Sequence, residues 1–171
     1  RGRLLMDEVT FNSKAIIGIT HHELERLKKF LVNHNSKIAR MCLHKTLRHS
    51  LHEMVIAFKR DHYVQPHKHI NKIESFHVIQ GSLFLIIFDD QGDIIKSIFM
   101  DDKKRGNSFL CRLEKNIWHM LIPMSDFVFV HETTNGPYNG QSDSIFPSWA
   151  PPPDDQAQIL RYKKKILNQT R

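Results

Sequence analysis

Short apolar segments separated by polar turns constrain the fold of this chain more than any other feature. The segments that favour β-strands are residues 53–59, 75–80, 83–88, 94–100, 109–113, 117–122 and 127–132. The segments at 83–88 and 94–100 flank a polar stretch that contains Gln91 and Gly92, which predicts a hairpin. Short strands at this spacing are typical of a sandwich or barrel rather than of alternating strands and helices. We therefore expect a mainly β domain from about residue 38 to residue 135.

A helix is predicted before the first of these strands. Thr20 and Glu23 have the spacing of a capping box, in which the side chain of each residue binds a free backbone N–H near the other. Leu24, Leu27 and Leu31 then repeat at helical spacing and predict one apolar face.

The C-terminal part of the chain has a different texture. After Glu132 the sequence is irregular, and prolines gather in residues 147–153. Asp154 or Asp155 is placed to cap a final basic helix over residues 156–167. We divide the chain into an N-terminal arm and helix (1–37), a β-barrel (38–135) and a proline-rich arm with a basic helix (136–171). A length of 171 residues allows all three in one domain.

Charge and composition narrow the classes of partner. The formal net charge is +7 at pH 7, but the basic residues are scattered apart from those in 161–165. The sequence has no glycine-rich aromatic motif that stacks RNA bases and no C₂H₂ finger spacing, so we expect no nucleic-acid partner. The longest apolar run, residues 83–88, is too short to span a membrane. An anionic small molecule fits the positive charge equally well.

Cysteine use and the N-terminal sequence bear on the cellular compartment. Cys42 and Cys111 lie far apart and form no CxxC pair, which is typical of reduced thiols. Residues 1–11 lack the long apolar stretch of a secretory signal. We therefore expect a cytoplasmic protein. Met6 is a candidate natural start, which would make residues 1–5 a non-native remnant.

His67, His69 and Glu74 form the most informative pattern in the chain. Residues two apart on an extended strand face the same side, so His67 and His69 point together into a barrel interior. The loop at 70–73 returns the chain, and Glu74 enters on the next strand. Two imidazoles and a carboxylate suit Zn²⁺, Mn²⁺, Fe²⁺, Ni²⁺ or Cu²⁺. His119, on a later strand, is the best candidate for a fourth ligand, and we expect one divalent metal ion of open identity.

These residues resemble the first sequence motif of the cupin superfamily. That motif runs from a glycine through His-x-His and a glutamate to a second glycine. The two histidines, the glutamate and Gly81 fall in register, whereas Asp61 stands at the first glycine. Asp tolerates a left-handed backbone better than most residues, so we expect this departure to be mild.

The second cupin motif, around His119, matches less closely. Glu114 stands where proline is usual, and Asn116 stands where glycine is usual. Asn can supply a turn with positive φ. The resemblance to both motifs implies an antiparallel β-barrel of cupin type (a double-stranded β-helix or jelly roll), with an N-terminal helix and a C-terminal arm added to it.

Six further segments carry a closer resemblance over roughly residues 38–153: RMCLH at 40–44, HEM at 52–54, YVQPHKH at 63–69, KIESFH at 72–77, GPY at 136–138 and FPSWAP at 146–151. They are similar to the WbuC family of bacterial cupin-fold metalloproteins. The family is named from O-antigen gene clusters, so the resemblance implies a role in the biosynthesis of bacterial surface polysaccharide, including lipopolysaccharide. Cupins commonly pair through sheet edges, which implies a homodimer.

Four further residues are candidates for catalysis or substrate binding. Lys72, Tyr63 and His77 are the catalytic candidates, and Lys72, Arg112 and Tyr63 the substrate-binding ones. Lys72 lies in the loop between the ligands, where it either neutralises an anionic substrate or is solvated. Tyr63 shares the parity of the ligating histidines and is expected to line the pocket. By strand alternation His77 faces the outer side unless it is catalytic, and Arg112 points either into the pocket or to solvent.

Strand parity also bears on residues around the ligands. His52 and Glu53 face opposite ways, so at most one of them points inward. A ligating imidazole usually has a hydrogen-bond partner behind it, and Glu132 or His131 is a candidate for that role.

Two classes of function remain open at this point. One is an enzyme, most naturally an isomerase, epimerase or related lyase, acting on a sugar, a nucleotide-sugar or a small hydroxy or keto acid. An Fe²⁺ oxygenase would use the same ligands. The other is a non-catalytic module that binds or senses a small sugar-like molecule.

Overall fold

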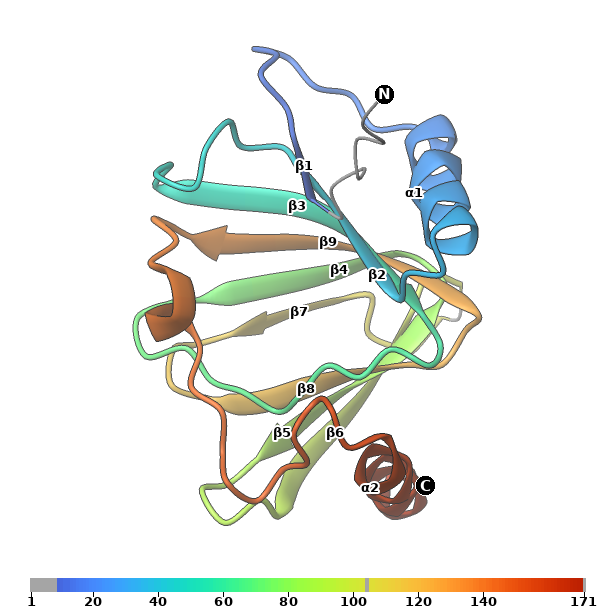
Figure 1. The fold of residues 1–171 in the computed structure, drawn as a ribbon, viewed down its shortest axis with the longest axis vertical. Helices are drawn as coiled ribbons and strands as arrows, with labels where there is room; N and C mark the ends of the chain where they lie inside the picture. The colour runs from blue at the N-terminus through green and yellow to red at the C-terminus, as the bar shows by residue number, and fades with distance from the viewer. Residues whose placement is uncertain (1–8, 104, 171) are drawn as a thin grey trace.

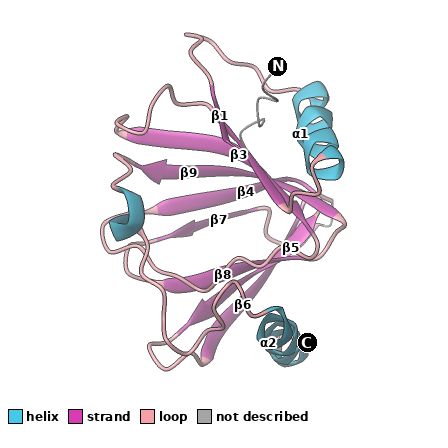
Figure 2. Ribbon diagram, in the orientation of Figure 1, coloured by secondary structure: helices cyan, strands magenta, loops and turns pink. Residues whose placement is uncertain are grey.

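The computed structural model describes residues 9–103 and 105–170, so Met6 and the residues before it lie outside the described part. Strands dominate, with one α-helix near each end of the chain (Figures 1 and 2). The helices are α1 (His21–Asn33), the short 3-10 helix η1 (Gly140–Asp143) and α2 (Gln156–Gln169). The strands are β1 (Val9–Phe11), β2 (Ile38–Cys42), β3 (Leu51–Lys59), β4 (Glu74–Gln80), β5 (Ser82–Phe88), β6 (Ile94–Asp101), β7 (Leu110–Leu113), β8 (Trp118–Pro123) and β9 (Phe127–Asn135).

The strands form two sheets. One has the order β1-β2-β3-β9-β4-β7, and the other has the order β6-β5-β8. Strand β1 runs parallel to β2, whereas the other pairings between these strands are antiparallel. The sheets enclose a common apolar interior, which confirms the predicted mainly β barrel with an added N-terminal helix and C-terminal arm.

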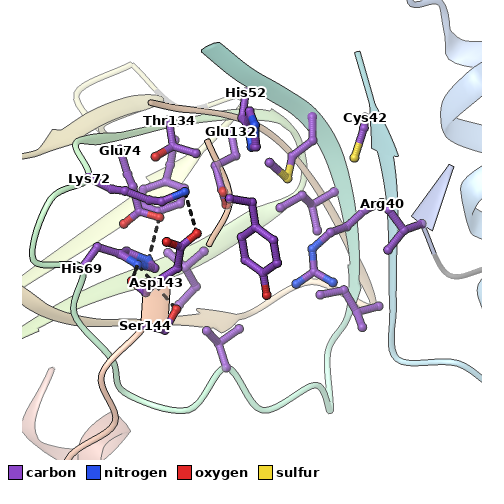
Figure 3. A pocket seen from close by; sticks show the side chains of 18 of the residues that line it. Arg40, Cys42, His52, His69, Lys72, Glu74, Glu132, Thr134, Asp143 and Ser144 are labelled. Atoms are coloured by element: carbon purple, nitrogen blue, oxygen red, sulfur yellow. Dashed lines mark hydrogen bonds and ion pairs between the residues drawn. The ribbon is translucent and has the colours of Figure 1, made fainter. Parts of the chain in front are cut away.

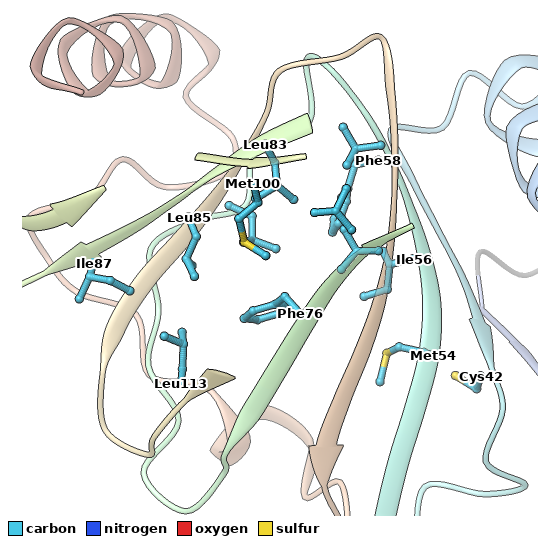
Figure 4. Packing of buried hydrophobic residues seen from close by; sticks show 14 residues of the cluster. Cys42, Met54, Ile56, Phe58, Phe76, Leu83, Leu85, Ile87, Met100 and Leu113 are labelled. Carbon is cyan, nitrogen blue, oxygen red and sulfur yellow. The ribbon is translucent and has the colours of Figure 1, made fainter. Parts of the chain in front are cut away.

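The interior is filled by side chains that alternate along each strand (Figure 4). On β3, Met54, Ile56 and Phe58 point between the sheets, whereas Val55 and Ala57 belong to a second cluster under α1. The two-residue period of a strand therefore gives β3 two buried faces. This explains why the segment is apolar almost throughout instead of alternating with polar residues.

Each long helix covers the outer face of one sheet (Figure 1). Three leucines of α1 pack on β2 and β3, and the capping box that begins the helix is confirmed, with the Thr20 N–H donating to Glu23 Oε2 at 2.9 Å. Ile166 of α2 packs on the three-stranded sheet. The cap of α2 is Asp155, which accepts a hydrogen bond from the Gln158 N–H at 2.9 Å. Within the described residues, no helix is long and apolar enough to cross a membrane.

Three strands differ from the sequence prediction. Strand β1 was not predicted, and β2 lies where the β-rich part of the chain was expected to begin but was not predicted as a strand, because so few residues carry little pattern. Strand β1 pairs with β2, and β2 pairs with β3, which extends the larger sheet. Strand β9 continues to Asn135, three residues past its predicted end at residue 132, because it pairs with the whole of β3 from Leu51 onward. The polar end of β9 is thus held by hydrogen bonds from the neighbouring strand rather than by apolar burial.

The residues at the turns of the two cupin-like motifs are explained by different features of the backbone. Gly81 has a φ of +94°, and a Cβ there would lie 2.7 Å from the Phe127 carbonyl oxygen, so only glycine fits. Asn116 has a φ of 64° and supplies the positive φ that the sequence predicted. Asp61, by contrast, is not among the described residues with positive φ, so its position requires no left-handed backbone.

Candidate metal centre

The four predicted ligands converge inside the barrel. His67 and His69 lie in the segment before β4, Glu74 is the first residue of β4, and His119 is in β8. One ligand atom from each residue lies within 4.8 Å of all the others. The structure thus brings together in space three segments that the spacing of the motifs had linked only in sequence.

Backbone pairing sets this convergence. His67 and His119 form an antiparallel bridge in which each N–H donates to the other residue's carbonyl, at 3.0 and 2.9 Å. The two rings therefore lie on the same face, with their centroids 4.4 Å apart. The Asn116 N–H donates to the His69 carbonyl at 2.6 Å, which ties the second histidine to the turn before β8.

The Nδ1 atom of each histidine faces a backbone carbonyl. For His67, His69 and His119 the partners are the carbonyl oxygens of Gln65 at 2.8 Å, Asp143 at 2.6 Å and Ile117 at 3.0 Å. A carbonyl only accepts, so Nδ1 carries a proton, and Nε2 is the atom that a metal would bind in place of any proton shared with Glu74. All three imidazoles therefore present a donor atom of the kind that divalent metals bind.

Charge within the cluster also favours a cation. The Nε2 atoms of His69 and His119 lie 3.1 and 3.2 Å from the two oxygens of Glu74. Burial alone would raise the pKa of Glu74, but its contacts with these two imidazoles outweigh burial and hold the pKa well below its usual range. Burial, reinforced by neighbouring His119, lowers the pKa of His67 to about 3 and keeps that ring neutral.

The donor set fits a divalent metal ion. The Nε2 atom of His119 is buried and makes no well-directed hydrogen bond despite its contact with Glu74. A buried nitrogen without a hydrogen-bond partner is costly, and coordination would remove that cost. Three imidazole nitrogens and one carboxylate suit Zn²⁺, Mn²⁺, Fe²⁺ or Ni²⁺ without choosing among them.

A cavity of about 590 Å³ opens from this cluster into the barrel (Figure 3). Apolar side chains such as Ile38, Ile56 and Phe58 form much of its wall. Arg40 and Glu132 also line it, on β2 and β9. The site therefore combines a polar metal-binding end with a largely apolar chamber that holds a few charged groups.

Lys72 lines this cavity but is not solvated. Its Nζ lies 2.9 Å from Asp143 Oδ2, and the two side chains are only 9% and 7% exposed. Nζ also lies 5.7 Å from the centroid of the Tyr138 ring. The charge of Lys72 is therefore matched by Asp143, whose own backbone carbonyl holds the ring of His69 (Figure 3).

The other three candidates do not face the cluster, and the expectations for Tyr63 and Arg112 need correction. The Tyr63 hydroxyl donates to the Pro151 carbonyl at 3.0 Å, and its ring packs with α2 outside the barrel. Burial raises the pKa of Tyr63. Arg112 lies opposite Ser75 on the outer face and pairs with Glu114. His77 also faces outward, against the ring of Phe109, as strand alternation favoured.

The predicted partners of the ligating imidazoles also need correction. Backbone carbonyls take this role in place of Glu132 and His131. His131 faces outward, 3.5 Å from Glu53, so His52 is the member of the 52–53 pair that points inward. Glu132 does line the cavity, and burial, reinforced by Glu74, raises the pKa of Glu132 to about 7.

Two residues that face the cavity had no functional signal in the sequence. Arg40 carried no signal beyond its place in a segment similar to the WbuC family, although it shares strand parity with the buried Cys42 and so faces inward. Asp143 lies in the irregular segment after β9, where no periodicity predicts the direction of a side chain. Its position became evident only from its contacts with Lys72 and His69.

Comparison with known proteins identifies the fold. A family model described as a domain of unknown function, DUF6016, matches residues 19–100, just under half of the chain. A search of curated proteins found no match. Among solved structures, the capsular polysaccharide assembling protein CapF from Staphylococcus aureus is 18% identical with a TM-score of 0.54, over 64% of this chain and 30% of that one. CapF with the inhibitor 3-isopropenyl-tropolone gives a TM-score of 0.55 at 18% identity, over 65% and 32%. The chain has a cupin fold.

A second likeness covers more of both chains. A Shewanella oneidensis protein from a structural genomics consortium is 13% identical with a TM-score of 0.50, over 72% of this chain and 75% of that one. The present chain spans about a third of CapF. At these identities the likeness concerns the cupin barrel alone, and the His/Glu cluster inside that barrel fits a metal-binding cupin.

Proposed function

We propose that this cupin is a metal-dependent enzyme that acts on a small molecule bearing hydroxyl or carbonyl oxygens, in the manner of an isomerase or epimerase. The observation that carries the proposal is the continuity between the four converging ligands and a cavity large enough for a small substrate. A purely structural metal would be enclosed by its ligands, with no chamber beside it.

The residues around the ligands supply further parts of such a reaction. A divalent cation held by the four ligands would polarise a carbonyl or hydroxyl oxygen and lower the pKa of bound water. Glu132 lines the same cavity, and in the metal-free protein burial, reinforced by Glu74, raises the pKa of its carboxyl group to about 7. A bound cation would offset the charge of Glu74, so burial is the cause that would persist in the metal-loaded enzyme. A carboxyl group whose pKa is raised by burial can both accept and return a proton, which isomerisation and epimerisation require. We assign Glu132 as the proton-transfer group, in place of Tyr63 and His77.

The biological setting that we propose is the biosynthesis of bacterial surface polysaccharide, such as O-antigen. The support is the resemblance of six sequence segments to the WbuC family. A homodimer and a cytoplasmic location belong to the same proposal and stay predictions.

The alternative is a non-catalytic cupin that binds or senses a small ligand. The apolar wall formed by residues such as Ile56, Phe58 and Val64 favours it, because apolar surfaces bind without contributing to proton transfer. Substitution of Glu132 distinguishes the enzyme from the binding module. The variant Glu132→Gln should abolish turnover in the enzyme and leave ligand affinity nearly unchanged in the binding module.

The test of metal dependence starts with the ligands. Either His67→Ala or His119→Ala should abolish stoichiometric metal, measured by plasma emission spectrometry on purified protein. His77→Ala is the matched control, because His77 faces outward on β4, and it should keep full metal. Full occupancy in both ligand variants would refute the site.

The second step tests function. Thermal-shift screening of hydroxy acids, keto acids and nucleotide-sugars should give larger shifts for metal-loaded than for metal-stripped protein. Equal shifts in the two forms would mean that the metal is structural, and the proposal of a metal-dependent enzyme would fail.

A further inference from the structure

Arg40 is a charged side chain placed in the apolar part of the cavity. It lies on β2, is half-buried, and reaches from the strand into the cavity (Figure 3). Its neighbours across the sheet are Val9 on β1 and Ile56 on β3, both apolar and both part of the cavity wall. An arginine side chain whose only role was solubility would point to solvent instead.

The guanidinium has no partner among the residues that the structure describes. Among the described residues that line the cavity, Lys72, Asp143, His44, Ser144 and the metal ligands form ion pairs or side-chain hydrogen bonds, and none of these involves the side chain of Arg40. Glu132 acts on Arg40 only as a nearby charge, without an ion pair. A partly desolvated guanidinium carries five N–H donors in a fixed fork, and leaving them unpaired is costly. The geometry therefore suits an acceptor that arrives with a ligand.

The charges of the cavity favour a ligand group with a single negative charge. Lys72 is already paired with Asp143 at 2.9 Å. His62 also lines the cavity, but burial and the charge of Arg40 lower its pKa to about 4, so it is neutral near pH 7. One guanidinium without a protein partner matches a carboxylate, which a guanidinium binds through two parallel hydrogen bonds. A phosphate monoester would bring about two negative charges to the single guanidinium at this end of the cavity.

We propose that Arg40 binds the carboxylate of the substrate, which makes the substrate a hydroxy acid, a keto acid or a sugar acid rather than a nucleotide-sugar. This rests on the proposed function, and it assigns the two ends of the cavity separate tasks. Arg40 holds the carboxylate, and the cluster of His67, His69, Glu74 and His119 faces the hydroxyl or carbonyl oxygen that reacts.

The test compares acids with their amides, which have nearly the same shape but no charge. Binding of glucuronate and glucuronamide, and of lactate and lactamide, is measured by titration calorimetry to metal-loaded protein. The wild type should prefer at least one acid over its amide by about ten- to a hundredfold, the range expected for hydrogen bonds to a charged group. Arg40→Met should lose that preference. Arg112→Met removes an arginine from the outer face and should keep it.

Folding and metal content are checked separately. Arg40→Met should retain the metal content and unfolding temperature of the wild type, and Arg40→Gln serves as a second variant if the first does not fold. Neither variant touches the metal ligands, so a lost preference reports on the ligand carboxylate.

Three results would overturn the proposal. The first is that no acid binds more tightly than its amide, and the second is that Arg40→Met keeps the preference. The third is that glucose 6-phosphate binds more tightly than glucuronate, which would assign the site to phosphate. Repeating the titrations on metal-stripped protein separates this proposal from the proposed function. If acids are preferred and bind equally well to metal-loaded and metal-stripped protein, Arg40 keeps its assigned role and the proposed metal dependence fails. If binding needs the metal but shows no preference for acids, the role of Arg40 fails and the proposed metal dependence stands.

Discussion

Removing the charge of Lys72 should destabilise the protein and weaken metal binding together. The variant Lys72→Met leaves the carboxylate of Asp143 buried without its cation, since the two side chains are only 9% and 7% exposed. Asp143 would keep a hydrogen bond from the Asn139 N–H at 3.0 Å. The backbone carbonyl of Asp143 holds Nδ1 of His69, so a shift of this segment would also disturb a ligand.

The magnitude follows from the burial of the pair. Breaking a buried ion pair by removing one partner costs about 3–5 kcal/mol, and the remaining hydrogen bond of Asp143 places the expected loss near the lower end, at about 3 kcal/mol. With a urea m-value of about 2 kcal/mol/M, the midpoint of unfolding should fall by about 1.5 M. Loss of support behind a ligand typically weakens metal binding by about 10- to 100-fold.

The assay is urea unfolding of metal-free protein, followed by competitive metal titration against a chelating dye. Lys37→Met is the matched control, because the pair of Lys37 and Asp61 is 47% and 64% exposed. Exposed pairs contribute about 0–1 kcal/mol, so this variant should lose no more than that. The double variant Lys72→Met/Asp143→Asn removes both charges of the pair, so it should be more stable than Lys72→Met alone.

The pH dependence gives an independent check. Burial by itself raises the pKa of Asp143, but the hydrogen bond from Lys72 outweighs it and lowers that pKa below its usual value of 3.8. A lowered pKa means that the pair stabilises the fold above pH 3.8 and that this contribution is lost as the pH falls through the native pKa. A loss for Lys72→Met no larger than that of Lys37→Met at pH 7, with unchanged metal affinity, would refute the reasoning.

Three further predictions concern the core, the cavity and the assembly. Leu31→Ala should lower the free energy of unfolding in urea by about 3 kcal/mol, because the Leu31 side chain is fully buried where α1 packs on the sheet. Val32→Ala, at a position that is 57% exposed, should lower it by well under 1 kcal/mol. Similar losses for the two variants would contradict the packing of α1. In metal-free protein, the raised pKa of Glu132 means that the wild type loses stability as the pH rises from 4.5 through about 7. Glu132→Gln should therefore flatten the dependence of the free energy of unfolding on pH in this range. An unchanged slope in the variant would argue against a raised pKa for this carboxyl group. Light-scattering chromatography should give a dimer near twice the 20.1 kDa chain mass, and a clean monomer at tens of micromolar protein would remove the predicted assembly.

The parts of the fold and site that sequence predicted share a local cause. The alternation of β4 from Glu74 placed Phe76 inward and His77 outward, because residues Glu74–His77 pair with β7 and β9 on both sides and keep the two-residue period of a strand. The capping box of α1 involves residues only three apart, so its geometry is contained in the spacing. The convergence of His67, His69 and Glu74 followed from a motif whose short loop returns the chain to the next strand, and His119 was added from a later strand.

The parts that were wrong depended on contacts distant in sequence. The inward direction predicted for Tyr63 from strand alternation was wrong because the residues around it form no strand. Without pairing to a neighbouring strand, the chain places the Tyr63 ring against α2. Arg112 faces outward because β7 pairs with β4 in a register that sets it opposite Ser75, which no local pattern reveals. The support of His69 by Asp143 joins residues 74 positions apart through an irregular segment.

The backbone carbonyls behind the three histidines have a consequence for how this site can evolve. An acceptor on the main chain is present whatever side chain the residue carries, so substitutions at Gln65 or Ile117 leave the orientation of the imidazoles intact. Point mutations at Gln65 and Ile117 are therefore buffered, unlike mutation of Lys72, whose pair with Asp143 holds the segment behind His69. Natural variants should differ most in the apolar walls of the cavity, while the imidazoles stay fixed. Insertions or deletions have no such protection, because a change of length in the segment that carries Asp143 would move its carbonyl away from His69. We expect the apolar walls of the chamber to diversify by substitution, and the metal site to be lost through changes in loop length or loss of the Lys72–Asp143 pair.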